Sequence, residues 1–493
     1  MSTEPPRPPG SPRSYNRRTV LRAGMGAAAA AAVPFGLGRG PARAGAATGA
    51  APSPLRWPTA LPYPSLPVGQ VTNAFPFDHI VIAMMENHSF DNYLGMLPQR
   101  GQPKADGFTF DAKGNPTNWN PIGHERMPVY HQAGAIGASD TGSQSWDDSH
   151  KQINGGAMNG FAGTGPGSMG YYTDEDLPFY YSLANTFCLA NRWFCSAPAQ
   201  TYPNRRFLMS ATAAGIISTD TNNIAINYPV NGTIWDLLSK HHISWRNYFS
   251  DAPTSIIMFD TVLKHPLNLA PIEEFYVDCA LGTLPSVSLV DCDMGAITGE
   301  AAGLALSPFK IPTFDAVQNI VDDTGQSEEA PEDIQLGEQF MANVTHAIMS
   351  GPAWHRTLLV WLYDEHGGYY DHVAPPRAPR PDVTPPMLTA SNQPGDYSLY
   401  GPRVPAVVIS PYSRPHEVTN VVHDHTSILA TIEQQWNLPA LTFRDANAAS
   451  LIDFLDTSHM AFAEPPALAK AANPLPGLLK GYGGVPSPPA PTP

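Results

Sequence analysis

The sequence feature that most constrains the fold is the uninterrupted apolar run Leu358–Tyr363, which ends directly in Asp364, Glu365 and His366. An apolar run of this length, without alternating polar residues, predicts a strand buried on both faces, as in the parallel sheet of an α/β protein. A glycine pair at 367–368 then allows the chain to turn. Open α/β sheets bind ligands at the carboxyl ends of their strands, so this triplet is a candidate site. A solvated acidic turn is the alternative.

A second stretch has the same organisation. The apolar run Ile80–Met85 predicts another buried strand and ends in Glu86 and Asn87, with Ser89 as a candidate N-cap for a following helix. Neighbouring carboxylates repel each other unless a cation or a shared proton relieves them. Carboxylate and amide oxygens suit a hard divalent cation such as calcium, magnesium or manganese, although iron or zinc could also bind them. The predicted metal ligands are Glu86, Asn87, Asp364 and Glu365.

Thr201 is the candidate nucleophile. Pro203 suits the first turn of a helix, which places Thr201 at or beside the helix N-terminus. Free N–H groups and the helix dipole favour an anionic phosphate there. A hydroxyl beside a metal could be deprotonated and attack phosphorus. An ordinary N-cap is the alternative role for Thr201.

The remaining patterns complete an α/β outline. Residues 100–178 are rich in Gly, Asn, Asp and Ser and are expected to form long loops with short helices over the sheet. Further strands are predicted at 243–249, 284–290 and 404–410, and helices at 336–349 and 428–436.

Two further histidines are candidates for the site. His150 lies in a segment, 145–156, that could form a wall of the site and contact substrate, although a surface histidine is the commoner outcome. His425 precedes the helix expected at 428–436, which Asp424 or Thr426 could cap, and would lie beside the same edge of the sheet.

The N-terminal residues are expected to be an export signal. Asn16–Arg22 contains a twin-arginine pair and is followed by a weakly apolar run to Leu37 and a small-x-small cleavage site at 42–44. This pattern predicts recognition by the twin-arginine export machinery and a secreted or cell-envelope location. The apolar run is too short for a permanent membrane span, and no other stretch qualifies.

Composition divides the chain into four segments. Residues 1–44 form the signal, 45–74 an extended lead-in, 75–463 the catalytic domain and 464–493 a tail rich in Pro, Ala and Gly. The formal net charge of -15 argues against nucleic-acid partners, which need a basic surface.

Four cysteines are expected to have a structural role. Outside the cytoplasm they could form two disulfides, and three connectivities are open. A zinc site is less favoured, because the spacings lack a C-x-x-C knuckle. The cysteines are Cys188, Cys195, Cys279 and Cys292.

Four short motifs, in this order, resemble the bacterial phospholipase C and acid phosphatase family of phosphoesterases, which includes the plant non-specific phospholipases C. The motifs are Glu86–Asn92, Thr201–Arg205, Tyr363–Gly368 and Asp424–Ser427. The resemblance implies a three-layer α/β/α sandwich of the alkaline-phosphatase type, with long loop insertions over the active site.

The resemblance also implies roles for individual residues. Glu86, Asn87, Asp364 and Glu365 would hold the metal, and Thr201 would form a phospho-threonine intermediate that water hydrolyses. His425 would serve in acid/base chemistry or phosphate binding, and His366 is a further catalytic candidate whose role could be structural. Asn204 and Arg205 would bind substrate. These residues stand at the matching positions of the motifs.

Two departures from the family pattern affect the expected substrate preference. Gln144 and Glu329 stand where many members have histidines, which could protonate a leaving oxygen or steady a phosphoryl group. His150 or His423 could compensate.

The sequence therefore predicts an exported, metal-dependent phosphoesterase that acts through Thr201, with phospholipids as the leading substrates and a phospholipase C reaction. An acid phosphatase and a non-catalytic phosphate-binding relative are the alternatives. A sulfatase-like enzyme is less favoured, because Thr201–Arg205 lacks the Cys or Ser that is converted to formylglycine.

Overall fold

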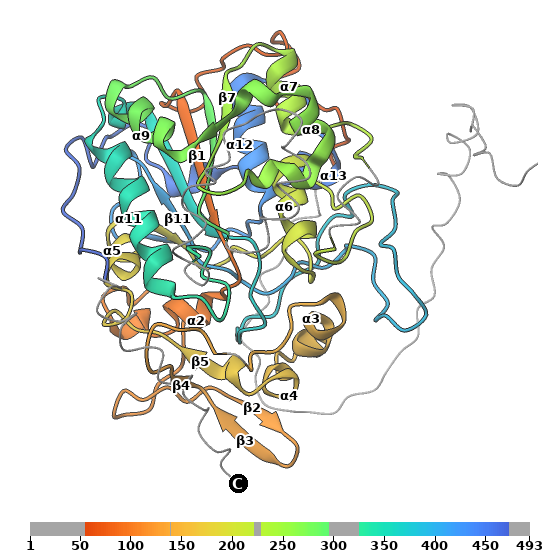
Figure 1. Ribbon diagram of the computed structural model, residues 1–493, viewed down its shortest axis with the longest axis vertical. Helices are drawn as coiled ribbons and strands as arrows, with labels where there is room; N and C mark the ends of the chain where they lie inside the picture. Colours follow the sequence, from red (N-terminus) through yellow and green to blue (C-terminus); the bar gives the residue numbers. More distant parts are fainter. Residues whose placement is uncertain (1–54, 139, 221–227, 295–324, 473–493) are drawn as a thin grey trace, which may run out of the picture. The chain divides into compact units, whose positions relative to one another are not determined.

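A mixed sheet forms the centre of the fold in this computed structural model, which describes residues 55–138, 140–220, 228–294 and 325–472 (Figure 1). The strand order is β12-β6-β11-β10-β1-β9-β7-β8. β11 runs antiparallel to both of its neighbours, while the pairs on the other side of β10 are parallel. The strands are β1 (His79–Met85), β6 (Cys188–Ala190), β7 (Trp245–Phe249), β8 (Leu269–Pro271), β9 (Val287–Asp291), β10 (Thr357–Tyr363), β11 (Ala406–Ile409) and β12 (Val418–Thr419).

Helices cover both faces of this sheet, which gives three layers (Figure 1). One face carries α5 (Pro178–Thr186), α9 (Ile272–Leu281) and α11 (Ile334–Ser350), which pack on β6, β9 and β10. The other carries α6 (Thr201–Ser210), α7 (Ile234–Lys240), α8 (Phe259–Lys264), α12 (Thr426–Trp436) and α13 (Phe443–Ala446). The expected α/β/α sandwich is therefore confirmed.

The pairing of β1 with β10 positions the candidate site. Both strands consist entirely of buried residues, as their apolar sequences predict. They pair in parallel from His79 opposite Thr357 to Met85 opposite Tyr363. Because the last residues of the two strands are paired, the polar segments that follow them leave the sheet side by side.

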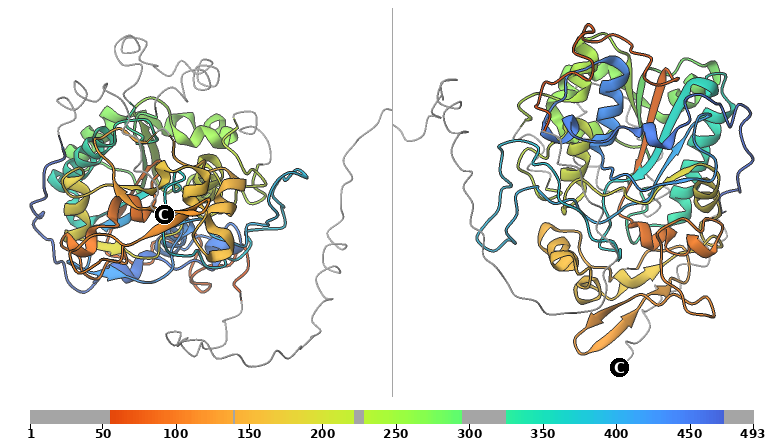
Figure 2. Two further views of the ribbon diagram at one scale, coloured as in Figure 1. Left: turned by 90° about the horizontal axis from the view of Figure 1, so that it is seen from below. Right: turned by 180° about the vertical axis from the view of Figure 1, so that it is seen from behind.

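The expected loop insertions lie beyond these strand ends (Figure 2). They contain α2 (Phe90–Leu94), whose N-cap is Ser89 as predicted, because the Ser89 side chain accepts a hydrogen bond from the backbone N–H of Asn92. They also contain short strands that the sequence did not indicate. The remaining elements of this region are β2 (Trp119–Ile122), β3 (Glu125–Pro128), β4 (Tyr130–His131), α3 (Trp146–Ile153), α4 (Phe161–Thr164) and β5 (Gly170–Tyr171).

Most of the predicted core elements are present. β1, β7, β9, β10 and β11 occupy the predicted strand segments, and α11 and α12 the predicted helices. β11, for which the sequence predicted a strand without a direction, runs antiparallel to its neighbours. The predicted signal at 1–44 lies outside the described residues, as does the tail from 473 onward; residues 55–74 contain neither helix nor strand. In the described ranges, none of the helices combines the length and apolar character needed to cross a membrane.

The four cysteines are buried free thiols, which corrects the expectation of two disulfides. Burial raises the pKa of Cys188 and of Cys279 to about 12, so both remain protonated at neutral pH. Buried, protonated thiols react slowly, because the thiolate is the nucleophile.

We therefore expect the native protein to be unreactive toward a thiol-specific disulfide reagent and to expose four reactive thiols in denaturant without reductant, since the chain has four cysteines. Spectrophotometric counting of the released thiolate measures both values. Two or fewer thiols in denaturant would show that a disulfide forms after all.

Candidate functional site

The candidate site is built on the ends of β1 and β10. Glu86 and Asn87 follow β1, Asp364 and Glu365 follow β10, and all four side chains are buried. Asp364 Oδ1 accepts hydrogen bonds from the backbone N–H groups of Asn87 at 3.1 Å and of Glu365 at 2.7 Å. Gly367 approaches closely here, because its φ is +61° and a Cβ atom would lie 1.9 Å from the carbonyl oxygen of Asn87. The two predicted ligand pairs are therefore brought together.

Three oxygens of the predicted ligand set have no hydrogen-bond partner among the described residues. They are Glu86 Oε2, Asn87 Oδ1 and Glu365 Oε1. Buried acceptors are rarely left without a partner, so an unpaired group requires an explanation. Oxygens of carboxylate and amide type are the ligands that a hard divalent cation takes. The donor set thus fits such a cation.

Two acidic side chains of the site have raised pKa values. Burial raises the pKa of Glu86 well above its usual value, although Arg205 opposes the shift. Burial and the adjacent Asp364 raise the pKa of Glu365 in the same way. Raised carboxyl pKa values mean that the site favours added positive charge, either as protons or as a cation.

Arg205 supplies part of that charge. Its Nε donates to Asp364 Oδ2 at 3.1 Å, and its Nη2 lies 3.4 Å from Glu86 Oε1. Arg205 thereby bridges two of the predicted ligands, and the described His, Cys, Asp and Glu side chains do not converge as a three-residue metal cluster. A metal site made of the predicted ligands would therefore need the amide oxygen of Asn87 in addition to carboxylate oxygens.

Thr201 is the first residue of α6 and is buried beside a cavity of about 350 Å³. Gln200, in an extended conformation, is the N-cap, so the alternative of an ordinary N-cap role for Thr201 is wrong. Thr201 shares the cavity with Glu86 and Arg205. The cavity therefore combines a hydroxyl at a helix N-terminus with one predicted metal ligand.

Gln144 and Glu329 also line this cavity. The two positions at which the chain departs from the family pattern are therefore positions of the site itself. The Glu329 carboxylate lies beside the side chains of Asn87 and Gln144, and burial raises its pKa.

His425 and His366 do not line the cavity, and they contact residues around it. His425 Nε2 donates to the carbonyl oxygen of Asp364 at 2.7 Å, and its Nδ1 accepts from Trp193 Nε1 at 3.4 Å. His366 Nε2 contacts Gln152 Oε1 at 2.7 Å, and burial lowers the pKa of His366 to about 3. Both ring nitrogens of His425 are engaged in these contacts, and its acid/base or phosphate-binding role stays a prediction.

The roles considered for two other histidines also change. His150 does not line the cavity, because its ring packs on Trp146 and its Nδ1 donates to the Trp146 carbonyl oxygen. His423 is held by Ser427 and Asp453, so neither histidine is placed to compensate for Gln144 and Glu329.

Asn204 also acts from outside the cavity. Its amide bonds the backbone at Ala197, Ala199 and Gln200 and fixes the loop before α6, so it positions Thr201 and does not line the cavity. Of the two predicted substrate-binding residues, only Arg205 reaches the cavity.

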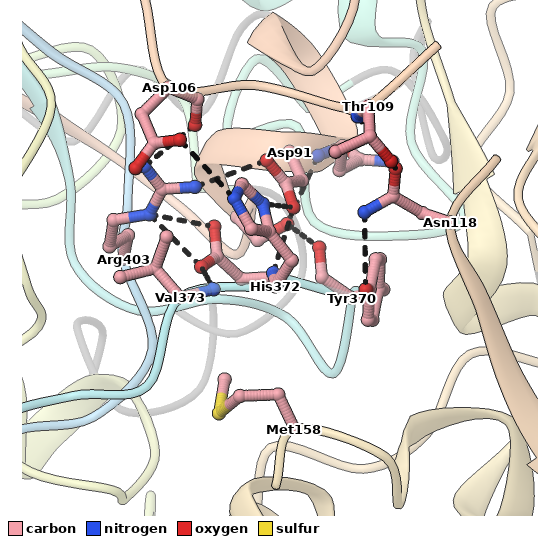
Figure 3. Close-up of polar contacts among 12 residues, drawn as sticks. Asp91, Asp106, Thr109, Asn118, Met158, Tyr370, His372, Val373 and Arg403 are labelled. Carbon is pink, nitrogen blue, oxygen red and sulfur yellow. Dashed lines mark hydrogen bonds and ion pairs between the residues drawn. The ribbon is translucent and has the colours of Figure 1, made fainter. Parts of the chain in front are cut away.

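A buried ionic network beside the site was not predicted (Figure 3). Arg403 contacts the carboxylates of Asp91 at 3.1 Å and of Asp371 at 3.0 Å, and all three side chains are fully buried. His372 Nδ1 lies 2.7 Å from Asp91 Oδ2. The network joins the segment after Glu86 and Asn87 to the segment after the 367–368 glycine turn. The position of Asp91 within the Glu86–Asn92 motif was the one available signal.

Glu328 forms a second unpredicted cluster. Its carboxylate accepts hydrogen bonds from the hydroxyls of Tyr93, Tyr180 and Tyr363 at 2.5 to 2.6 Å. Burial raises the pKa of Glu328 to about 8 despite these bonds. This cluster fixes the backbone immediately before Glu329 and so determines where Glu329 enters the cavity.

Several known proteins are similar to this chain. The model of the Phosphoesterase family matches residues 77–439. Non-specific phospholipase C1 of Arabidopsis thaliana is 31% identical over 408 residues, which cover 76% of this chain and 70% of that protein. Phospholipase C A of Mycobacterium tuberculosis is 29% identical and covers 82% of this chain and 81% of its own length. A solved protein of the alkaline phosphatase superfamily from Vibrio parahaemolyticus aligns with a TM-score of 0.33 and 12% identity over 71% of this chain and 77% of its own.

Proposed function

Since the chain belongs to the Phosphoesterase family and is a phosphoric ester hydrolase, we propose that it is a phospholipase C that uses Thr201 as nucleophile and a divalent cation as cofactor. The relatives named as phospholipases C support the reaction. The observation that carries the cofactor proposal is that one buried oxygen each of Glu86, Asn87 and Glu365 has no hydrogen-bond partner among the residues that the structure describes. Calcium, magnesium and manganese suit these ligands best.

In the proposed reaction, Thr201 Oγ1 attacks phosphorus and displaces the diacylglycerol oxygen, which takes up a proton. Water then hydrolyses the threonine phosphodiester and releases the phosphorylated head group. The N-terminus of α6 would offer the backbone N–H of Thr201 and the positive end of the helix dipole to the phosphoryl oxygens. A bound cation would supply charge stabilisation and lower the pKa of the nucleophile. Arg205 partly neutralises Glu86 and Asp364, which lets the acidic strand ends accept an anionic substrate.

Export by the twin-arginine route is part of the proposal. It is supported by the twin-arginine pair within Asn16–Arg22 and by the small-x-small sequence at 42–44. N-terminal sequencing of the protein recovered outside the cytoplasm tests it; a chain that retains Met1 would contradict removal of a signal.

The decisive experiment compares three substrates with and without EDTA. We expect the purified protein to hydrolyse phosphatidylcholine and p-nitrophenylphosphorylcholine, and EDTA to abolish both activities until calcium, magnesium or manganese is restored, because the predicted ligands Glu86, Asn87 and Glu365 have unpaired oxygens. Activity on p-nitrophenyl phosphate alone would instead indicate a phosphatase. Inactivity on all three substrates with every metal would indicate a non-catalytic relative.

A further inference from the structure

Glu329 brings a carboxylate into the cavity, and among the described residues no cation lies within ion-pair distance of it, although the charge of Arg205 acts on it from further away. The Glu329 side chain lines the cavity beside Thr201 and lies next to Asn87 and Gln144. Arg205, the cation among the lining residues, has its ion pairs with Asp364 and Glu86. Arg205 also donates to the backbone carbonyls of Met84 and Met85. A positively charged group of a substrate in the cavity could therefore pair with Glu329.

The rest of the cavity suits an organic cation. Tyr202 places an aromatic side chain in the lining, and Ile256, Ile257 and Met294 give an apolar wall. A carboxylate combined with aromatic and apolar surface is the environment in which proteins bind ammonium groups, because aromatic faces attract cations and apolar walls accept their methyl groups. A volume of about 350 Å³ accommodates a lipid head group, whereas two acyl chains need space outside it.

We propose that Glu329 is a specificity residue that selects phosphodiesters whose head-group alcohol carries an ammonium group. The proposal rests on the proposed phosphodiesterase function and names its substrate class. The phosphate lies toward Thr201 and the ammonium toward Glu329, so the two opposite charges of the substrate meet complementary groups in one cavity.

The same charge disfavours two other substrate classes. An anionic or neutral head group leaves Glu329 unpaired, and a phosphomonoester dianion brings a second negative charge next to Glu86 and Glu329. Histidines at the positions of Gln144 and Glu329 would have the opposite preference, because a protonated imidazole attracts a dianion. The departure from the family pattern thus acts as a selection against phosphomonoesters.

The test measures kcat/KM of the full-length enzyme and of E329Q on phosphatidylcholine and phosphatidylglycerol in matched mixed micelles. We expect the ratio of the two values to fall about tenfold in E329Q, mainly through KM for phosphatidylcholine, because a charge-assisted contact is lost. p-Nitrophenylphosphorylcholine, which has the same head group without a lipid, should show the same loss. A loss seen only with micelles would place the effect at the lipid surface and overturn the proposal.

E332Q is the matched control. Glu332 lies three residues further along and accepts hydrogen bonds from Ser327 N and Oγ at 3.0 and 2.8 Å, and it does not line the cavity. We expect E332Q to keep the wild-type ratio. An unchanged ratio of the two kcat/KM values in E329Q would overturn the proposal. An equal loss of kcat/KM on both lipids, together with a higher metal concentration needed for activity, would also overturn it, because it would assign Glu329 to the cation site.

Binding separates this inference from the proposed function. Calorimetry with phosphocholine and glycerol phosphate on T201A, and on T201A with E329Q, reports head-group selection without turnover. We expect the preference for phosphocholine to disappear in the double variant. If the wild-type enzyme hydrolyses none of the lipids, the proposed function fails; if it hydrolyses both and E329Q changes neither ratio nor binding preference, only the role of Glu329 fails.

Discussion

Thr201→Ala is expected to lower kcat/KM for phosphatidylcholine by a factor on the order of 10⁴ or more, because the substitution removes the only group assigned to attack phosphorus. The fold should survive. Thr201 starts α6 without acting as its N-cap, and no hydrogen bond joins its hydroxyl to another residue in the described part of the chain. The loss of activity should therefore occur without a shift in the thermal unfolding midpoint.

Thr201→Ser and Thr219→Ala are the controls. Serine keeps the hydroxyl at the first position of α6 and should retain measurable turnover. Thr219 also lines the cavity, and its Oγ1 accepts from the backbone N–H of Tyr202 at 3.4 Å, so its loss should cost less than about tenfold. Mass spectrometry of the wild type, acid-quenched during turnover of phosphatidylcholine, should find a phosphocholine adduct on the peptide that contains Thr201. Full activity in Thr201→Ala would remove it as nucleophile.

The parts of the site that could be predicted are those that local sequence encodes. The apolar runs before Glu86 and Asp364 indicate buried strands without ambiguity, and parallel strands place their carboxyl ends at one edge. Pro203 indicates the start of α6 in the same way. These signals bring the ligand pairs and Thr201 together before any tertiary contact is known.

The parts that could not be predicted depend on pairing between distant segments. Arg205 could be assigned to substrate, but its bridge between Glu86 and Asp364 depends on how α6 packs against the sheet. A histidine in a motif does not reveal whether its nitrogens are free, and His425 uses both to hold Asp364 and Trp193. Likewise, an apolar run fixes the burial of β11 but not its direction, since antiparallel and parallel central strands have the same composition.

Arg403→Ala is expected to destabilise the protein by about 3–5 kcal/mol, the usual cost of breaking a buried ion pair from one side. The substitution leaves the carboxylates of Asp91 and Asp371 without their shared guanidinium at positions that exclude water (Figure 3). It also removes donors to the backbone carbonyls of Asp106 and Asn191 and the contact of the guanidinium with the Phe90 ring at 4.3 Å. Urea unfolding followed by circular dichroism measures the loss.

Arg377→Ala is the matched control, because Arg377 is exposed and its hydrogen bond at 3.1 Å is to Ser398 Oγ. Its expected cost is below about 0.5 kcal/mol. The double variant Arg403→Met with Asp371→Asn removes charge from both sides and should be less destabilising than the sum of the two single variants, because fewer buried charges are left unpaired. If Arg403→Ala costs no more than Arg377→Ala, the network does not hold the two ligand-bearing segments together. If it costs the expected amount, activity should also fall in the folded fraction, because Asp91 follows Glu86 and Asn87 while Asp371 follows Asp364 and Glu365.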